Sequence, residues 1–171
     1  MKAKNTNSSA KLRAGILTVS DRSSQGLRED SSGPELEHML RSHGFQVAWT
    51  AVVPDETEEI GKVLISWADE SKADLILTTG GTGLSPRDVT PEATIAVSQR
   101  LIPGMAEAMR AESLKKTPHA MISRAVAVVR GRTLIINLPG SPRGAKENLE
   151  VVLPALEHAI SKIQGDPTEC A

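Results

Sequence analysis

The stretch TTGGTGLSPRDVTPEAT, residues 78–94, decides the fold of this chain of 171 residues. It follows the apolar run LIL at 75–77 and passes through a glycine-dense loop to Thr90-Pro91. A short apolar run predicts a buried strand, and a proline in this position is typical of the first turn of a helix. The stretch therefore predicts a strand, a long polar loop and a helix in succession.

Further apolar runs along the chain predict strands at 14–19, 45–53, 125–129 and 133–138. Residues with helical spacing follow two expected capping pairs, Ser32 with Glu35 and Asp55 with Glu58, and occur again after Pro103 and Pro142. Strands joined by helices need right-handed crossovers, and these cover both faces of a parallel sheet. We therefore expect an α/β fold, a three-layer α/β/α sandwich with a mostly parallel sheet. The turn at 130–132, RGR, predicts one antiparallel hairpin within it.

Composition places the chain among single soluble domains and excludes some partners. The formal net charge is -1 and only 2% of the residues are aromatic, so we expect neither nucleic-acid nor membrane binding. Residues 1–12 are polar and small, which predicts a loose tail. The chain has no apolar run long enough for export or for spanning a membrane, and Cys170 is its only cysteine. These features predict a cytoplasmic protein.

Polar residues follow the predicted strands at four points: SDR at 20–22, PDE at 54–56, TTGGTG at 78–83 and NLPGSP at 137–142. Ligands of open α/β sheets bind in the crevice beyond the carboxyl ends of the strands. We therefore expect the four segments to converge at one edge of the sheet and to form the binding site there.

The glycine loop suits a phosphate group, because residues without a Cβ let backbone N–H groups approach an anion closely. The sequence has neither a Walker A motif nor the G-x-G-x-x-G fingerprint. Arg87 suits phosphate oxygens, and Asp88 suits magnesium or the orientation of a hydrogen-bond donor. Alternatively, the glycines form only a tight turn, and Arg87 and Asp88 form a loop-stabilising pair or a solvated doublet.

Two further residues have alternative roles on the sequence alone. Asp55 is either the N-cap of the helix that follows it or, with Asp88, a ligand of a magnesium-bound phosphate. Ser141 is either an N-cap or a donor to an anion at the start of a helix. The four histidines lack the spacing of a zinc site and are better explained as exposed or capping residues: His38, His43, His119 and His158.

Taken together, these motifs resemble those of a known protein family. TVSDR at 18–22, PDE at 54–56, the stretch 78–94 and NLPGSP at 137–142 resemble bacterial molybdopterin adenylyltransferases, which share the molybdopterin-binding fold. The resemblance extends to 30–33, 103–110 and 123–125. It covers residues 13–163, which we take as the domain, and leaves 1–12 and 164–171 as tails.

The resemblance implies transfer of AMP from Mg-ATP to the terminal phosphate of molybdopterin, with release of pyrophosphate. It implies that Asp55 and Asp88 are catalytic aspartates associated with Mg²⁺. The substrate-binding residues that we expect, from the resemblance and from their chemistry, are Ser20, Asp21, Arg22, Thr79, Gly80, Gly81, Thr82, Gly83, Arg87, Ser123, Gly140, Ser141 and Pro142. It also implies a homotrimer or a higher symmetric oligomer, and a molybdenum-insertion protein is the partner that we expect.

Two other functions are compatible with the same motifs. One is a carrier that binds molybdopterin without transferring AMP, and the other is a scaffold that delivers the pterin to an insertion partner. The presence of both aspartates argues against a carrier. For Ser123, contact with the substrate and an ordinary position at the start of a strand remain alternatives.

Overall fold

The computed structural model describes residues 11–168; most of the expected N-terminal tail, the last residues of the C-terminal tail and Cys170 lie outside this range. The strands are β1 (Arg13–Val19), β2 (Gln46–Val53), β3 (Leu75–Thr79), β4 (Arg100–Leu101), β5 (Ala127–Arg130) and β6 (Thr133–Leu138). The α-helices are α1 (Asp21–Ser24), α2 (Ser32–Ser42), α3 (Thr57–Ile65), α4 (Thr90–Ala96), α5 (Pro103–Leu114) and α6 (Pro142–Ile163). A π-helical turn, η1 (Ser66–Glu70), and a 3-10 turn, η2 (Pro118–Ile122), complete the set.

The six strands form one sheet in the order β2-β1-β3-β6-β5-β4. β1 is parallel to β2 and β3, and β3 is parallel to β6. β5 runs in the opposite direction to the other described strands, because it pairs in antiparallel fashion with both β4 and β6. The mostly parallel sheet is confirmed, and so is the hairpin, whose turn follows the pairing of Arg130 with Thr133.

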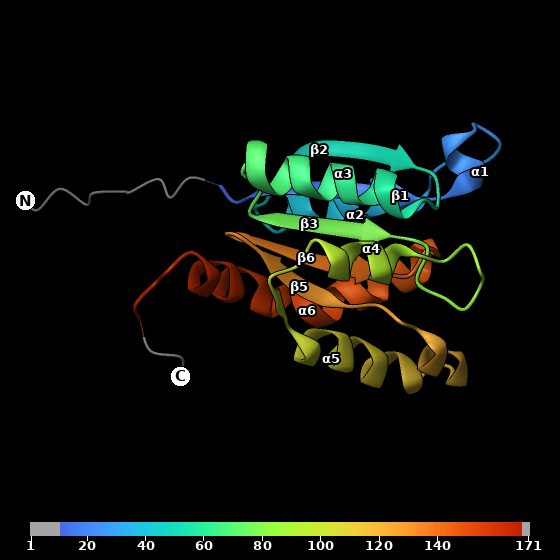
Figure 1. Ribbon diagram of the computed structural model, residues 1–171. Coiled ribbons are helices and arrows are strands. Elements are labelled where there is room, and N and C mark those ends of the chain that lie inside the picture. Colours follow the sequence, from blue (N-terminus) through green and yellow to red (C-terminus); the bar gives the residue numbers. More distant parts are fainter. Residues whose placement is uncertain (1–10, 169–171) are drawn as a thin grey trace, which may run out of the picture.

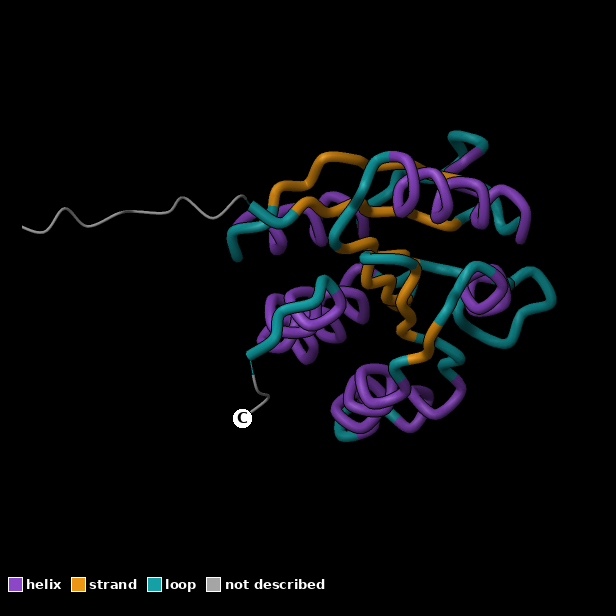
Figure 2. Tube along the Cα trace, turned by 60° about the vertical axis from the view of Figure 1, so that its left-hand side comes forward, coloured by secondary structure: helices purple, strands orange, loops and turns teal. Residues whose placement is uncertain are grey.

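Helices cover both faces of the sheet (Figures 1 and 2). On one face, α2, α5 and α6 enclose a core that includes Leu36, Met109 and Leu149. On the other face, α3, η1 and α4 enclose a second core that includes Ile60 and Trp67. Every residue of β3 and β6 is buried, as expected for central strands packed on both sides. The predicted three-layer sandwich is confirmed.

The carboxyl ends of the parallel strands all lie at one end of the molecule. In Figure 1, α1 and the loop after β3 project beyond the arrowheads of β2 and β3. The register sets this arrangement, because Val19 pairs with Val53 and Thr79 pairs with Leu138 at the strand ends. The segments that follow these strands are therefore neighbours in space.

Both expected capping pairs are wrong. The first turn of α2 is capped from outside by Asp30, whose Oδ1 accepts the N–H groups of Ser32 and Gly33 at 3.1 and 3.0 Å. Ser32 lies inside the helix, and its hydroxyl donates to the carbonyl oxygen of Gly140 at 2.8 Å. A carboxylate is the stronger acceptor for helix N–H groups, so it replaces the serine. At α3, Asp55 makes no cap, and its side chain reaches α1 instead.

Candidate functional site

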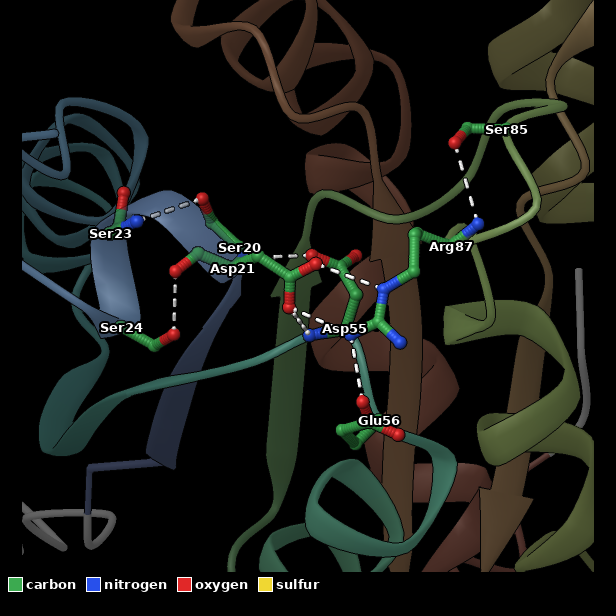
Figure 3. Close-up of polar contacts among 8 residues, drawn as sticks. All are labelled: Ser20, Asp21, Ser23, Ser24, Asp55, Glu56, Ser85 and Arg87. Carbon is green, nitrogen blue, oxygen red and sulfur yellow. Dashed lines mark hydrogen bonds and ion pairs between the residues drawn. The ribbon is translucent and has the colours of Figure 1, made fainter. Parts of the chain in front are cut away.

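Asp21 and Asp55 are joined by two reciprocal hydrogen bonds at the exits of β1 and β2. The backbone N–H of Asp21 donates to Asp55 Oδ2 at 2.8 Å, and the backbone N–H of Asp55 donates to Asp21 Oδ1 at 3.0 Å (Figure 3). Ser20, the N-cap of α1, accepts the N–H of Ser23. The carboxylate of Asp55 therefore belongs to the start of α1 rather than to α3.

The two carboxyl groups are shifted in opposite directions. Burial raises the pKa of Asp55, and the negative charges of Asp21 and Asp88 raise it further. Hydrogen bonds from the Arg87 guanidinium and from the Asp55 backbone lower the pKa of Asp21. Of these two carboxylates, Asp55 is the one that would gain more from an added positive charge.

Arg87 lies in the loop between β3 and α4 and contacts acidic residues that follow β1 and β2. Its Nε and Nη2 donate to the two carboxylate oxygens of Asp21 at 3.0 and 2.9 Å, and it also pairs with Glu56 at 2.8 Å. The alternative in which Arg87 pairs with Asp88 is therefore wrong. Asp88 instead accepts the N–H of Ser85 at 2.8 Å, within its own loop.

The glycine loop has the backbone geometry of an anion site. Gly80 and Gly81 have φ angles of 102° and 65°, which residues with a Cβ rarely adopt. A Cβ on Gly80 would collide with the carbonyl oxygen of Val19. The backbone N–H groups of Gly81 and Thr82 donate to no other residue within 11–168. Successive free N–H groups in such a turn form a nest for an anion.

A cavity of about 320 Å³ is lined by residues from the segments that follow β1, β2, β3 and β6. Of the expected site residues, eight line it: Ser20, Asp55, Thr79, Gly80, Gly81, Asp88, Gly140 and Ser141. A second cavity, of about 300 Å³, shares Ser141 with the first and is lined by three more of them: Thr82, Gly83 and Ser123. Its walls also include apolar side chains such as Met109 and Ile122.

The remaining expected residues lie outside the two cavities. Asp21 is connected to the first cavity by its hydrogen bond to Asp55, and Arg87 is hydrogen-bonded to Asp21. Arg22 is exposed, and neither it nor Pro142 lines either cavity. Ser141 is the N-cap of α6, with its Oγ accepting the N–H of Gly144 at 3.2 Å, so its capping role is confirmed.

The donor set of the first cavity suits a hard cation that arrives with a phosphate ligand. Asp55 and Asp88 both line the cavity. Within residues 11–168 no three His, Cys, Asp or Glu side chains are grouped to hold a metal by themselves. Mg²⁺ is commonly bound by one or two carboxylates together with substrate phosphates, so two aspartates are a sufficient protein contribution. The raised pKa of Asp55 is consistent with this, because a cation would offset the repulsion among the carboxylates.

Comparison with known proteins assigns the family. Residues 15–158 match the family model described as "Probable molybdopterin binding domain". The chain belongs to this family. Molybdopterin adenylyltransferase of Helicobacter pylori is 44% identical over 154 residues, which are 89% of this chain and 88% of the relative. Gephyrin of Dictyostelium discoideum is 47% identical over 90% of the chain, but the chain spans only 23% of gephyrin.

A solved structure supports the same assignment. The crystal structure of the molybdopterin biosynthesis enzyme MoaB from Thermus thermophilus matches this molybdopterin-binding domain with a TM-score of 0.86 and 55% identity. The match covers 92% of this chain and 99% of the MoaB chain. In the part of the domain that the structure describes, no helix has the length and apolar character needed to cross a membrane.

Three residues that shape the site of this molybdopterin-binding domain were not among the expected site residues. Arg124 donates to the carbonyl oxygens of Gly83 and Asp88 at 2.7 and 2.6 Å, and it pairs with Glu92. The Thr90 hydroxyl donates to the carbonyl oxygen of Gly80 in the glycine loop. The side-chain amide of buried Asn137 donates to Thr94, one helical turn after Thr90. The sequence does contain a signal for Asn137. It is the one side-chain amide in an apolar strand, and a buried amide needs hydrogen-bond partners. Arg124 gave no such signal.

Proposed function

We propose that this molybdopterin-binding domain transfers AMP from ATP to the terminal phosphate of molybdopterin and releases pyrophosphate. One observation carries the proposal: the free N–H group of Gly81 and the carboxylate of Asp55 adjoin one cavity, at the carboxyl ends of β1, β2, β3 and β6. This combination suits a polyanionic ligand. The name of the Helicobacter pylori relative, molybdopterin adenylyltransferase, indicates the transfer of AMP to molybdopterin, and the Thermus thermophilus relative is described as a molybdopterin biosynthesis enzyme.

In the proposed reaction, a phosphate oxygen of molybdopterin forms a bond to the α-phosphorus of ATP. The bond from that phosphorus to the bridging oxygen breaks, and pyrophosphate leaves with its electron pair. The protein has to align the two phosphates and to stabilise the developing charge. The N–H groups of Gly81 and Thr82 are suited to bind phosphate oxygens, and no covalent intermediate on the protein is needed.

Asp55 and Asp88 would hold Mg²⁺ in this proposal, together with oxygens of the substrate phosphates. When bound, the ion supplies neutralising charge at those oxygens. Asp21 keeps Asp55 in place through the reciprocal hydrogen bonds. Arg87 holds the Asp21 carboxylate in place with two hydrogen bonds, and these lower the pKa of that carboxyl group.

The second cavity is the proposed site of the pterin. Apolar side chains of Met109, Ile122 and Ala125 form part of its wall, and Ser123 and Ser141 provide hydroxyl groups. Ligand sites commonly combine an apolar lining with a few polar groups that fix orientation. Because Ser141 lines both cavities, a pterin in the second could extend its phosphate toward the first.

The test is the formation of adenylylated molybdopterin and pyrophosphate by the purified protein with ATP, molybdopterin and Mg²⁺. We expect product from the wild type, and a loss of at least a hundredfold in Asp55→Asn. Asp69→Asn is the matched control, because Asp69 pairs with Arg130, and neither residue lines the cavity. Tight binding of molybdopterin without product would contradict the proposal and favour a carrier.

The proposal includes the assembly and the setting of the protein. It takes residues 13–163 as the functional domain, a homotrimer or a larger symmetric oligomer as the assembly, and the cytoplasm, where ATP is available, as its location. It also includes delivery of the product to a molybdenum-insertion protein. Exposed apolar side chains beside the second cavity, at Met121 and Ile122, support contact with another protein. Light scattering coupled to size-exclusion chromatography would measure the oligomeric state.

A further inference from the structure

Thr90 is the first residue of α4, and its side chain is completely buried. Its hydroxyl donates to the carbonyl oxygen of Gly80 at 2.8 Å, and its backbone N–H donates to the carbonyl oxygen of Gly81 at 3.1 Å. One residue therefore binds the carbonyl groups of both left-handed glycines. A Cβ on Gly81 would collide with the Thr90 hydroxyl, so the loop lies directly against this side chain.

The position of Thr90 is fixed from the core of the sheet. Thr94, one helical turn later, donates from its hydroxyl to the carbonyl oxygen of Thr90 at 2.8 Å. The side-chain amide of Asn137, on β6, donates to the hydroxyls of Thr94 and Thr78, each at 2.9 Å. All four residues are fully buried. A continuous hydrogen-bonded chain thus runs from the two central strands to the glycine loop.

These contacts determine which backbone groups of the loop remain available. With the carbonyl groups of Gly80 and Gly81 held by Thr90, the peptide units on either side of Gly81 are fixed in orientation. The N–H groups of Gly81 and Thr82 then stay free of partners within the described residues. An anion site made of backbone N–H groups is effective only when the groups are oriented before the ligand arrives.

We infer that Thr90 is a positioning residue, which orients the glycine loop for polyphosphate binding and receives support from Thr94 and Asn137. This inference rests on the proposed function, and it assigns a task to a residue that lies outside the expected site residues. Without the hydroxyl, the carbonyl group of Gly80 loses its donor and the loop becomes free to turn. The affinity for polyphosphate falls as a result, although the carboxylates are unchanged.

The main test compares Thr90→Val with a matched control, Thr133→Val. Thr133 is also fully buried, and its hydroxyl donates to the carbonyl oxygen of Ala73 at 2.6 Å, at the opposite end of the sheet. Each variant removes one hydroxyl from one buried carbonyl group, so the losses of stability should be similar. We expect only Thr90→Val to weaken binding, by at least tenfold for inorganic pyrophosphate, and Thr90→Ser to restore it.

The readout that does not depend on activity is the NMR shift of the Gly81 and Thr82 amides during titration with pyrophosphate. Equal affinity of Thr90→Val and wild type would overturn the inference, as would equal losses in Thr90→Val and Thr133→Val. Wild-type amides that do not respond to pyrophosphate would overturn it too. A wild type that binds pyrophosphate at these amides but makes no adenylylated pterin would contradict the proposed function alone.

If Thr90→Val does not fold, Thr94→Val provides an alternative test, because the Thr94 hydroxyl donates to the carbonyl oxygen of Thr90. It leaves the Thr90 hydroxyl in place and removes its support, so we expect a smaller loss of affinity, about threefold. Pyrophosphate binding as tight as in the wild type would then overturn the inference.

Discussion

The backbone N–H of Asp21 donates to the carboxylate of Asp55, and the backbone N–H of Asp55 donates to the carboxylate of Asp21. The two residues are 34 positions apart, and they meet because β1 and β2 are parallel neighbours that end together. The pair fixes the place of a half-buried carboxylate at the cavity, and burial together with the charges of Asp21 and Asp88 raises the pKa of that carboxyl group. In the proposed function, Asp55 is kept for ligand binding at a cost in stability.

Replacement of Asp55 by asparagine should stabilise the protein near neutral pH. The pKa of Asp55 is raised in the folded state, so its ionisation opposes folding as the pH rises through that pKa. Asparagine removes this cost and keeps an oxygen that accepts the N–H of Asp21. Thermal unfolding between pH 3 and 8 measures the effect, which should be smallest at pH 3, grow as the pH rises from the ordinary carboxyl pKa of 3.8 through the raised pKa of folded Asp55, and stay constant above that pKa. A lower Tm than the wild type at pH 8 would contradict this prediction.

Removal of the charge on Asp88 should lower the pKa of Asp55. The negative charge of Asp88 is one of the causes that raise that pKa, after burial and the charge of Asp21. NMR titration of ¹³C-labelled carboxyl groups in Asp88→Asn measures the change, and Asp69→Asn provides the control. An unchanged midpoint for Asp55 would show that the two carboxylates do not interact.

Arg124 should determine the order of the loop between β3 and α4. Its guanidinium donates to two carbonyl oxygens of the loop, at Gly83 and Asp88. Arg124→Met should cost about 1.5–3 kcal/mol, the range for hydrogen bonds to charged groups, and should expose the loop to proteases. Limited proteolysis and urea unfolding measure both effects. Arg143→Met, which removes an exposed arginine paired with Glu147, should leave both nearly unchanged.

Gly80→Ala should destabilise the protein more than the same substitution at Gly131. Both glycines have positive φ, at 102° and 55°, but only at Gly80 would a Cβ meet another backbone atom. We expect a loss of about 1 kcal/mol at Gly131 from the backbone conformation alone, and more than about 2 kcal/mol at Gly80. Equal losses in urea unfolding would mean that the contact with Val19 is easily relieved.

The sequence predicted the fold because the information on strands is local. Runs such as 75–77 and 133–138 are apolar over their whole length, and the structure buries them on both faces. The rule that ligands bind beyond the strand ends then indicated where to look. The structure brings Ser20, Asp55 and Gly80 to one cavity, as those strand ends require.

The partners of individual side chains were not predictable in the same way. Asp55 precedes α3 with the spacing of a cap, yet its carboxylate binds a backbone N–H that β1 brings near. Arg87 stands next to Asp88 in sequence, but its guanidinium pairs with Asp21 and Glu56. Each choice depends on segments far apart along the chain, so a local window contains no information on it. The same reason explains why Arg124 was missed.

The position of β6 in the sheet has a consequence for how the protein is made. β6 is the last strand of the sheet to be synthesised, yet it lies between β3 and β5, and Gly140 after it lies against Gly80. While the ribosome is still translating the hairpin, β3 has one unpaired apolar edge and the cavity lacks a wall. Unpaired edges of this kind promote association between nascent chains. A chain truncated before Thr133 is therefore expected to aggregate rather than to retain weak activity.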